Sequence, residues 1–242
     1  MLFSIIICTY NSKEKLPKTL DSILAQNFSD YEVVVIDGVS TDGTVEVIKK
    51  YEKIFLNRLR WISEKDRGIY EAMNKGVRMA RGKFLNVVGA GDWLEADALK
   101  KISEEIEKNP QAKAFYGKTR IWNEKKTKNW LVQTLPKILP TQPMQHPALY
   151  YQKELHQSFG FYSEEYQIAS DYLFCLKVFH FGKIPVISLD SVLVNFVSDG
   201  ISSKKRWQCL KENWKIKRVL GLKNTYFQDG KNFLKAKLKN GK

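Results

Sequence analysis

The chain has 242 residues, of which 43% are hydrophobic and 27% charged, and this composition suits one globular domain. It excludes a disordered, collagen-like or disulfide-rich chain. The three cysteines, Cys8, Cys175 and Cys209, are far apart, so neither a disulfide framework nor a thiolate zinc site is expected. The first apolar run, Ile5–Cys8, is too short for a signal peptide, and no stretch is long enough to cross a membrane. These features predict a cytoplasmic protein.

The basic residues are concentrated at the carboxyl-terminal end. The net charge is +14, and residues 204–242 hold 13 basic and 2 acidic residues, a net charge of +11. We therefore divide the chain into a domain at 1–203 and a basic, aromatic-containing helical tail at 204–242. Two interpretations of the tail stay open: a basic helix packed on the domain, or attachment to the anionic inner face of the cell membrane. Nucleic-acid binding is not expected, because no helix-turn-helix, RRM or KH signature is present.

Apolar runs alternate with helical periodicity through the first half of the chain. Strands that alternate with helices predict βαβ units, and so an α/β fold with a mixed, mostly parallel sheet flanked by helices. From Ala114 onward the alternation fades to short strands and one helix at about Asp171–His180. The elements predicted before Ala114 are, in chain order, the strand Phe3–Cys8, the helix 16–26, the strand Tyr31–Ile36, the helix Thr44–Tyr51, the strand Leu59–Ile62, the helix Ile69–Arg81, the strand Phe84–Val88 and the helix Ala96–Lys108.

Polar residues follow each of the four predicted strands. Ligands of parallel sheets bind beyond the carboxyl ends of the strands, so we expect these polar clusters to meet in one crevice. The dinucleotide pattern GxGxxG and the P-loop pattern GxxxxGK[ST] are both absent from the sequence, which excludes the usual phosphate cradles. The clusters are Thr9 to Asn11, Asp37, Glu64 to Asp66, and Asp92.

Each candidate side chain has a functional and a structural interpretation. Asp37 suits hydrogen bonds from a nucleoside base or ribose, and equally a turn or a helix cap. Asp92 suits Mg²⁺ or Mn²⁺ bridging a diphosphate, and equally the cap of the next helix. Asp171 suits a general base, and equally the N-cap of an apolar helix. His146 lies in a proline-bounded segment, and a lone histidine is more often structural than catalytic.

Four motifs, taken together in their order and spacing, resemble one enzyme family. They are similar to the inverting, GT-A-fold glycosyltransferases of family 2, in the branch tied to bacterial capsule, exopolysaccharide and lipopolysaccharide synthesis. Later segments around His146, Asp171 and Gly200 match the same branch, so the resemblance covers about residues 3–203. The four motifs are Thr9-Tyr10-Asn11, the loop from Asp37 to Thr44, the segment from Ser63 to Gly76, and Gly89-Ala90-Gly91-Asp92.

The resemblance implies a reaction and a set of site residues. The implied reaction moves a sugar from a nucleotide-sugar, by family a UDP-sugar, to a hydroxyl of a glycan or lipid-linked acceptor, with inversion and with Mn²⁺ or Mg²⁺ as cofactor. The implied roles are Thr9, Asn11 and Asp37 on the nucleoside, Asp66, Arg67 and Gly68 near the ribose and diphosphate, Asp92 on the metal, Asp171 as catalytic base, and His146 on the diphosphate or acceptor side.

One motif departs from the family pattern. The family's DxD element normally offers two or three carboxylates, whereas Gly89, Ala90 and Gly91 leave only Asp92 here. A single carboxylate holds a divalent cation weakly without the nucleotide. Two alternative functions stay open: a non-catalytic module that binds anionic surfaces, and a nucleotidyltransferase. The second class usually carries a Gly-rich, basic loop directly after the first strand, and this chain does not.

Overall fold

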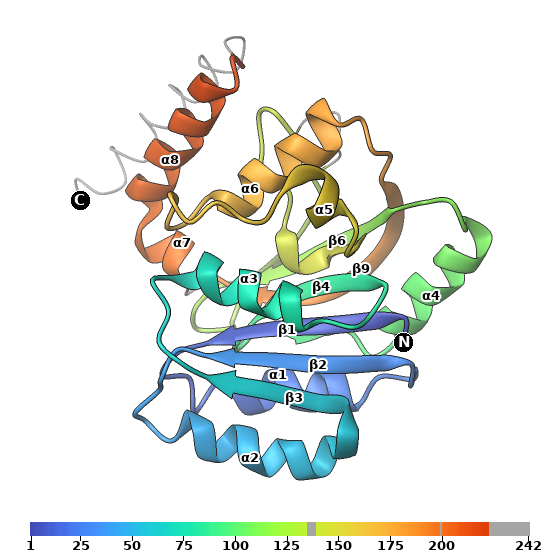
Figure 1. The fold of residues 1–242 in the computed structure, drawn as a ribbon, viewed down its shortest axis with the longest axis vertical. Coiled ribbons are helices and arrows are strands. Elements are labelled where there is room, and N and C mark those ends of the chain that lie inside the picture. Colours follow the sequence, from blue (N-terminus) through green and yellow to red (C-terminus); the bar gives the residue numbers. More distant parts are fainter. Residues whose placement is uncertain (135–138, 199, 223–242) are drawn as a thin grey trace.

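The computed structural model describes residues 1–134, 139–198 and 200–222. Its centre is one mixed sheet with strand order β3-β2-β1-β4-β8-β6-β9-β5, and β7 pairs with β6 outside this path. Helices flank the sheet (Figure 1). The strands are β1 (Phe3–Thr9), β2 (Tyr31–Asp37), β3 (Leu59–Ser63), β4 (Phe84–Gly89), β5 (Trp93–Leu94), β6 (Ala114–Trp122), β7 (Asn129–Val132), β8 (Leu149–Gln152) and β9 (Ile187–Val197).

The first half of the chain builds the parallel part of the sheet. Strands β3, β2, β1 and β4 run parallel, and all seven residues of β1 and of β2 are buried because helices cover both faces. This burial explains why these strands read as continuous apolar runs and not as alternating ones. The register pairs Thr9 with Asp37 and Asp37 with Ser63, so the polar residues at these strand ends lie side by side, as the sequence predicted.

Helices α1 and α2 belong to one face of the parallel strands and α3 to the other (Figure 1). Helix α3 approaches β1 so closely at Gly76 that an added Cβ would lie 2.4 Å from a methyl carbon of Ile6. Only glycine allows this approach, and it brings the start of α3 over the carboxyl end of β1. The helices of the first half are α1 (Leu16–Leu24), α2 (Thr44–Phe55), the 3₁₀ turn η1 (Leu56–Arg58), α3 (Ile69–Met79) and α4 (Ala98–Lys108).

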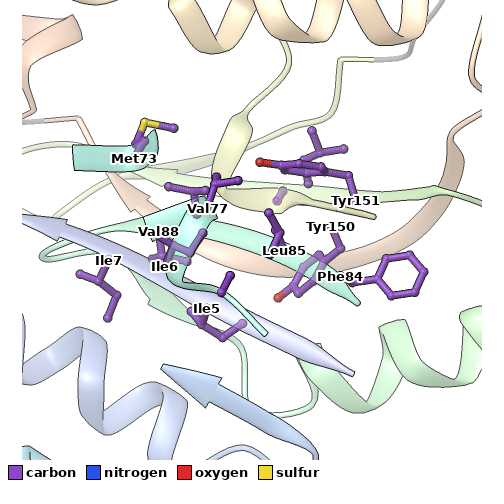
Figure 2. Close-up of a cluster of buried hydrophobic side chains, with 14 of the residues drawn as sticks. Ile5, Ile6, Ile7, Met73, Val77, Phe84, Leu85, Val88, Tyr150 and Tyr151 are labelled. Carbon is purple, nitrogen blue, oxygen red and sulfur yellow. The ribbon is translucent and has the colours of Figure 1, made fainter. Parts of the chain in front are cut away.

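A hydrophobic core joins the two halves of the sheet. Figure 2 shows Val77 of α3 and side chains of β1 and β4 close to Tyr150 and Tyr151 of β8. All of the β1 and β8 side chains in this cluster are less than 2% exposed. Strand β8 runs antiparallel to β4 and to β6, so the sheet changes direction at this point.

The second half of the chain covers the carboxyl ends of the parallel strands. Helix α6 continues directly into a π-helical segment, where the sequence predicted one regular helix from Asp171 to His180. Helix α8 stands beside α6 (Figure 1). The helical elements are η3 (His146–Ala148), α5 (Leu155–Phe159), α6 (Ser170–Cys175), the π-helical η4 (Leu176–Phe181), α7 (Ile201–Lys204) and α8 (Arg206–Val219), and residues 223–242 of the predicted tail lie outside the described residues.

Candidate active site

Asp92 lies in the turn between β4 and β5, at the carboxyl end of the parallel strands. It is 7% exposed, and its Oδ1 accepts a hydrogen bond from the backbone N–H of Val197 at 3.0 Å. Its Oδ2 lies over Gly89, where an added Cβ would be 2.9 Å away. The next helix, α4, has Asp97 at its N-cap, and β5 separates it from Asp92. The helix-cap interpretation of Asp92 is therefore wrong.

Asp171 is the second residue of α6, and the N-cap position belongs to Ala169. Its Oδ1 accepts hydrogen bonds from the Tyr70 hydroxyl and from the Tyr172 backbone N–H, both at 2.9 Å. Burial raises the pKa of this carboxyl above its usual value, although the two hydrogen bonds oppose the shift. The carboxylate is thus not a helix cap, and its raised pKa makes it a stronger proton acceptor.

His146 ends a chain of four hydrogen-bonded side chains in the core. Its Nε2 meets the Tyr162 hydroxyl at 3.0 Å, Tyr162 meets the Tyr151 hydroxyl at 2.5 Å, and Tyr151 meets Nε2 of His156 at 3.0 Å. Burial lowers the pKa of both histidines to about 4, so both rings are neutral at pH 7.

Hydrogen-bond counting then fixes the tautomer of His146. The carbonyl oxygen of Gly160 only accepts, so the His156 Nδ1 that meets it at 3.1 Å carries the proton. The Nε2 of His156 must accept from Tyr151, so Tyr151 accepts from Tyr162, and Tyr162 accepts from Nε2–H of His146. The His146 Nδ1 is left with a lone pair and can accept a hydrogen bond from a hydroxyl group.

One cleft of about 270 Å³ brings three of the predicted site residues together. Asp92, His146 and Asp171 all contribute to its lining. Most other lining side chains are apolar, from the ends of β4, β9 and the start of α3, so the cleft combines a few polar groups with a hydrophobic wall. A second cleft of about 300 Å³ adjoins it and shares Ile69, Tyr70 and Gln167.

The predicted nucleoside residues lie at the ends of β1 and β2, beside this cleft. Asp37 is fully buried, and its carboxylate accepts hydrogen bonds from the Ser40 N–H and hydroxyl and from the Ser63 hydroxyl. The Ser40 bonds are those of a turn, as one of the two interpretations predicted. Thr9 is 6% exposed, and among the described residues its hydroxyl has no hydrogen-bond partner. A buried hydroxyl without a partner is costly. Six other buried side-chain atoms of the described residues also have none, so Thr9 is a candidate ligand contact chiefly because it ends β1.

Asn11 joins the loops that follow β1 and β2. Its side-chain oxygen accepts a hydrogen bond from the Thr41 N–H at 2.9 Å, and its own N–H donates to the Ser40 hydroxyl at 2.8 Å. Ser12 and Lys13 donate in the same way to Thr44 and Asp42. In this structure Asn11 therefore orders the rim of the site.

The segment after β3 positions Asp66, Arg67 and Gly68 differently from one another. Asp66 accepts a hydrogen bond from the Gly68 N–H at 3.0 Å. Burial raises the pKa of Cys8 at the end of β1, and the Asp66 charge adds to this shift. Arg67 and Gly68 line the second cleft. The Arg67 guanidinium pairs with Glu71 at 2.8 Å and with Glu164 at 2.5 Å. Asp66 also lies beside Gly38 at the end of β2, where an added Cβ would be 2.9 Å from its Oδ2.

The side chains available as metal ligands determine which kind of metal site this cleft can form. Within residues 1–134, 139–198 and 200–222, no group of three or more His, Cys, Asp or Glu side chains is placed to hold a metal ion. Asp92 is the single carboxylate of the β4–β5 turn. Mg²⁺ and Mn²⁺ often take only one or two protein carboxylates and complete their coordination with phosphate and water. Asp92 fits a cation that arrives with a diphosphate, and does not fit a cation held by protein alone.

Two functional neighbours were not predicted from the sequence. Tyr70, which donates to Asp171, lies inside the motif from Ser63 to Gly76, but nothing in the motif marks its hydroxyl. Glu212 of α8 accepts hydrogen bonds from three backbone N–H groups just before α6. Its signal was available, because Glu212 is one of only two acidic residues among residues 204–242.

Sequence comparison gives the family and two named relatives. The family described as "Glycosyl transferase family 2" matches residues 4–176. A "PGL/p-HBAD biosynthesis glycosyltransferase" of Mycobacterium bovis (strain BCG / Pasteur 1173P2) is 34% identical over 179 residues, which are 74% of this chain and 70% of that protein. The chondroitin synthase of Escherichia coli is 28% identical over 220 residues, which are 88% of this chain but 31% of the synthase.

Structural comparison gives the fold. The crystal structure of S. aureus TarS 1-349 in complex with UDP-GlcNAc superposes with a TM-score of 0.74 at 21% identity, and the match covers 92% of this chain and 66% of that one. The mannosyltransferase PcManGT from Pyrobaculum calidifontis, in complex with GDP-Man and Mn²⁺, superposes with a TM-score of 0.67 at 21% identity over 86% of this chain and 60% of that one. The fold is thus the GT-A fold that the sequence predicted, and this chain belongs to glycosyl transferase family 2.

Proposed function

We propose that this protein transfers a sugar from a UDP-sugar to a hydroxyl group of a glycan or lipid-linked acceptor in bacterial surface polysaccharide synthesis. The observation that carries the proposal is the shared cleft, which joins Asp92, His146 and Asp171 at the carboxyl ends of the parallel strands. The name of one relative, a chondroitin synthase, supports a carbohydrate acceptor, and the name of the other supports a biosynthetic glycosyltransferase. The family match favours this function over a nucleotidyltransferase or a non-catalytic module.

On the donor side, we expect the nucleoside to bind at the carboxyl ends of β1 and β2. Among the described residues the Thr9 hydroxyl has no hydrogen-bond partner, and Asp37, Asn11 and Asp66 form or order its surroundings. The TarS complex with UDP-GlcNAc supports a uridine nucleotide, and the PcManGT complex with GDP-Man is the competing case. Arg67 and Gly68, in the segment after β3, would contact the same nucleotide from the side.

For the metal, we propose that Asp92 holds Mn²⁺ or Mg²⁺ together with the donor diphosphate. The Mn²⁺ of the PcManGT complex supports a divalent cation at such a site. When bound, the cation would stabilise the negative charge of the leaving diphosphate. The chain's own contribution is Asp92, whose Oδ1 is anchored by the Val197 N–H.

On the acceptor side, Asp171 would take the proton from the attacking hydroxyl. The acceptor oxygen forms a bond to the anomeric carbon while the bond from that carbon to the diphosphate breaks, and the nucleoside diphosphate leaves. This single displacement inverts the anomeric configuration and needs no second carboxylate nucleophile. The raised pKa of Asp171 favours proton transfer to it, and the neutral His146 would accept a hydrogen bond from a sugar hydroxyl.

We further propose that the basic residues 204–242 hold the enzyme at the anionic inner face of the cell membrane. Their net charge of +11 supports this attachment, since each basic residue near such a surface contributes about 1 kcal/mol. Within the described residues no helix is long and apolar enough to cross a membrane.

The donor is tested with a thermal-shift panel of UDP, GDP, CMP and dTDP, each with and without Mn²⁺. A ligand that binds the native state raises the melting temperature by mass action. We expect UDP with Mn²⁺ to give the largest shift, followed by transfer from a UDP-sugar to a glycan acceptor. A larger shift with GDP would overturn the UDP assignment, and no shift with any nucleotide would overturn the proposed function.

A further inference from the structure

Helix α8 is basic, yet it meets the segment before α6 through its single acidic residue, Glu212. The Glu212 Oε2 accepts hydrogen bonds from the N–H groups of Ile168 at 2.8 Å and Ala169 at 3.1 Å, and its Oε1 accepts one from Gln167 at 3.2 Å. The backbone N–H groups of three consecutive residues thus all donate to one carboxylate, which lies more than 40 residues later in the chain.

A second contact reinforces this junction. The Gln208 side-chain amide, one turn earlier on α8, donates to the Glu212 Oε1 at 3.0 Å and to the Gln167 side-chain oxygen at 2.8 Å. Helix α8 is itself anchored to the domain, because Ile216 and Lys217 are at most 2% exposed. The segment 167–169 is therefore held from α8 by both its backbone and a side chain.

The held segment leads directly to the proposed base. Ala169 is the N-cap of α6 and Asp171 follows two residues later, so any displacement of this turn moves the base. Gln167 and Ile168 also line the cleft that contains Asp171. We propose that Glu212 is a positioning residue for sugar transfer, which holds the 167–169 turn and thereby sets the place of Asp171 in the cleft.

The contact is strong for a physical reason. Hydrogen bonds to an ionised acceptor are about twice as strong as neutral ones, and loss of the carboxylate would leave three backbone donors without this partner. Small displacements of reacting groups also have large kinetic effects, since 1 Å can cost 10²-fold in rate.

Glu212 also acts on Asp171 through its charge. Tyr70 faces Asp171 and donates a hydrogen bond to it. Tyr162, Cys175 and Cys209 also interact with it and are neutral, because burial raises their pKa values and the Asp171 charge adds to the shift. Burial is the main cause of the raised pKa of Asp171, and the negative charge of Glu212 adds to it. A change at Glu212 should therefore alter the pH dependence of transfer, which a purely structural contact would not do.

The experiment compares Glu212→Ala and Glu212→Gln with the wild type and with a matched control, Glu165→Ala. Glu165 is an exposed acid of the neighbouring loop, and its carboxylate accepts no hydrogen bond from residues 167–169. Three quantities are measured on the full chain: amide hydrogen exchange of residues 167–169, UDP affinity, and kcat for transfer from a UDP-sugar as a function of pH.

We expect Glu212→Ala to speed exchange of these three amides and to lower kcat by roughly 10- to 100-fold, with UDP affinity unchanged. Glu212→Gln keeps one acceptor oxygen, so it should retain more of kcat. Because it removes the negative charge, it should also move the acid limb of the pH profile to lower pH. The control should match the wild type in all three measurements.

The inference rests on the proposed function, and the two fail in different ways. Unchanged exchange of amides 167–169 in Glu212→Ala, or unchanged kcat and pH profile in both variants of an active enzyme, would overturn the positioning role alone. If Glu212→Ala does not fold, the pH profile of Glu212→Gln decides. A wild-type protein that transfers no sugar would overturn the proposed function and this role with it.

Discussion

The two carboxylates of the cleft, Asp92 and Asp171, differ in what surrounds them. Asp92 is anchored by a backbone N–H of β9, which suits a fixed ligand for a cation. Asp171 is half-buried beside the Tyr70 hydroxyl, and the loss of water around its carboxyl raises its pKa, which suits a base. Carboxyl groups in different environments take different roles in one reaction, and here the environments separate the proposed metal ligand from the proposed base.

Asp92→Asn keeps the shape of the side chain and removes its charge. Its Oδ1 can still accept from the Val197 N–H, so the fold should stay intact. We expect the stimulation of transfer by Mn²⁺ or Mg²⁺ to disappear, with turnover reduced at least 100-fold. A metal titration of transfer rate measures this effect. Full turnover in the variant, or in the wild type with EDTA, would show that the metal assignment is wrong.

Thr9→Val removes the buried hydroxyl that has no partner among the described residues. If UDP supplies that partner, the variant should lose affinity several-fold, since one hydrogen bond contributes about 0.5–1.5 kcal/mol. The free protein should be equally or more stable, because an unsatisfied buried hydroxyl is removed. Calorimetric titration with UDP measures the expected loss of affinity, and a thermal melt of the free protein measures the expected equal or higher stability. Equal UDP affinity would remove Thr9 from the site.

At the level of elements, the first half of the chain could be predicted closely and the second half only coarsely. Strands β1 and β2 follow from local patterns, since both are buried apolar runs. By contrast, β5 has two residues, and its pairing with β9 joins segments about a hundred residues apart. A local pattern contains no information on such a pairing, so Asp92 was read as a possible helix cap.

The same limit applies to the site. Asp92, His146 and Asp171 could be predicted because each stands in a motif. The contacts of Tyr70 and Glu212 could not be predicted, because they are made across 101 residues and across 43 to 45 residues of sequence. The scarcity of acidic residues among 204–242 singles out Glu212 but indicates no partner for it. The roles of the motif residues in donor binding and catalysis remain predictions.

The hydrogen-bonded chain from His146 of η3 through Tyr162 and Tyr151 to His156 of α5 predicts how stability depends on pH. The folded-state pKa values of His146 and His156, about 4, lie below the ordinary value of 6.5, so the unfolded chain binds more protons between these pH values. Stability is therefore fully present above pH 6.5 and falls as the pH drops toward 4, by about 1.4 kcal/mol per pH unit and histidine. Thermal melts from pH 7 to pH 4 measure it.

The matched variant is His156→Asn, which removes one of the two titrations. Its free energy of unfolding should be lower at pH 7 but should decline less steeply as the pH falls. Equal slopes for the variant and the wild type would contradict the assignment of neutral, buried histidines.

For the whole molecule, the structure shows where the basic region can be divided. Glu212 of helix α8 accepts hydrogen bonds from the segment before α6, so a deletion from residue 204 would damage the domain itself. A chain of residues 1–222 keeps this helix. It loses residues 223–242, which hold six basic residues and one acidic residue.

We expect the 1–222 chain to fold and to bind UDP as the full chain does. Its binding to phosphatidylglycerol-containing vesicles should fall at least tenfold, since the lost basic residues contribute about 1 kcal/mol each near an anionic surface. Phosphatidylcholine vesicles are the control and should bind neither chain. Equal binding of both chains to the anionic vesicles would exclude residues 223–242 as the membrane attachment.

The central claim is that Asp171 accepts the proton in a sugar transfer, and Asp171→Asn tests it most directly. Asparagine can still accept from Tyr70, so the site keeps its shape. A raised folded-state pKa means that the ionised carboxyl lowers stability at pH 7, so the variant should melt at the same or a higher temperature.

The decisive measurement is kcat for transfer from a UDP-sugar, with UDP affinity measured on the same preparations. We expect Asp171→Asn to lower kcat by about 10²–10⁴-fold, the range for general acid–base catalysis, and to leave UDP affinity unchanged. A variant that transfers sugar at close to the wild-type rate would contradict the account.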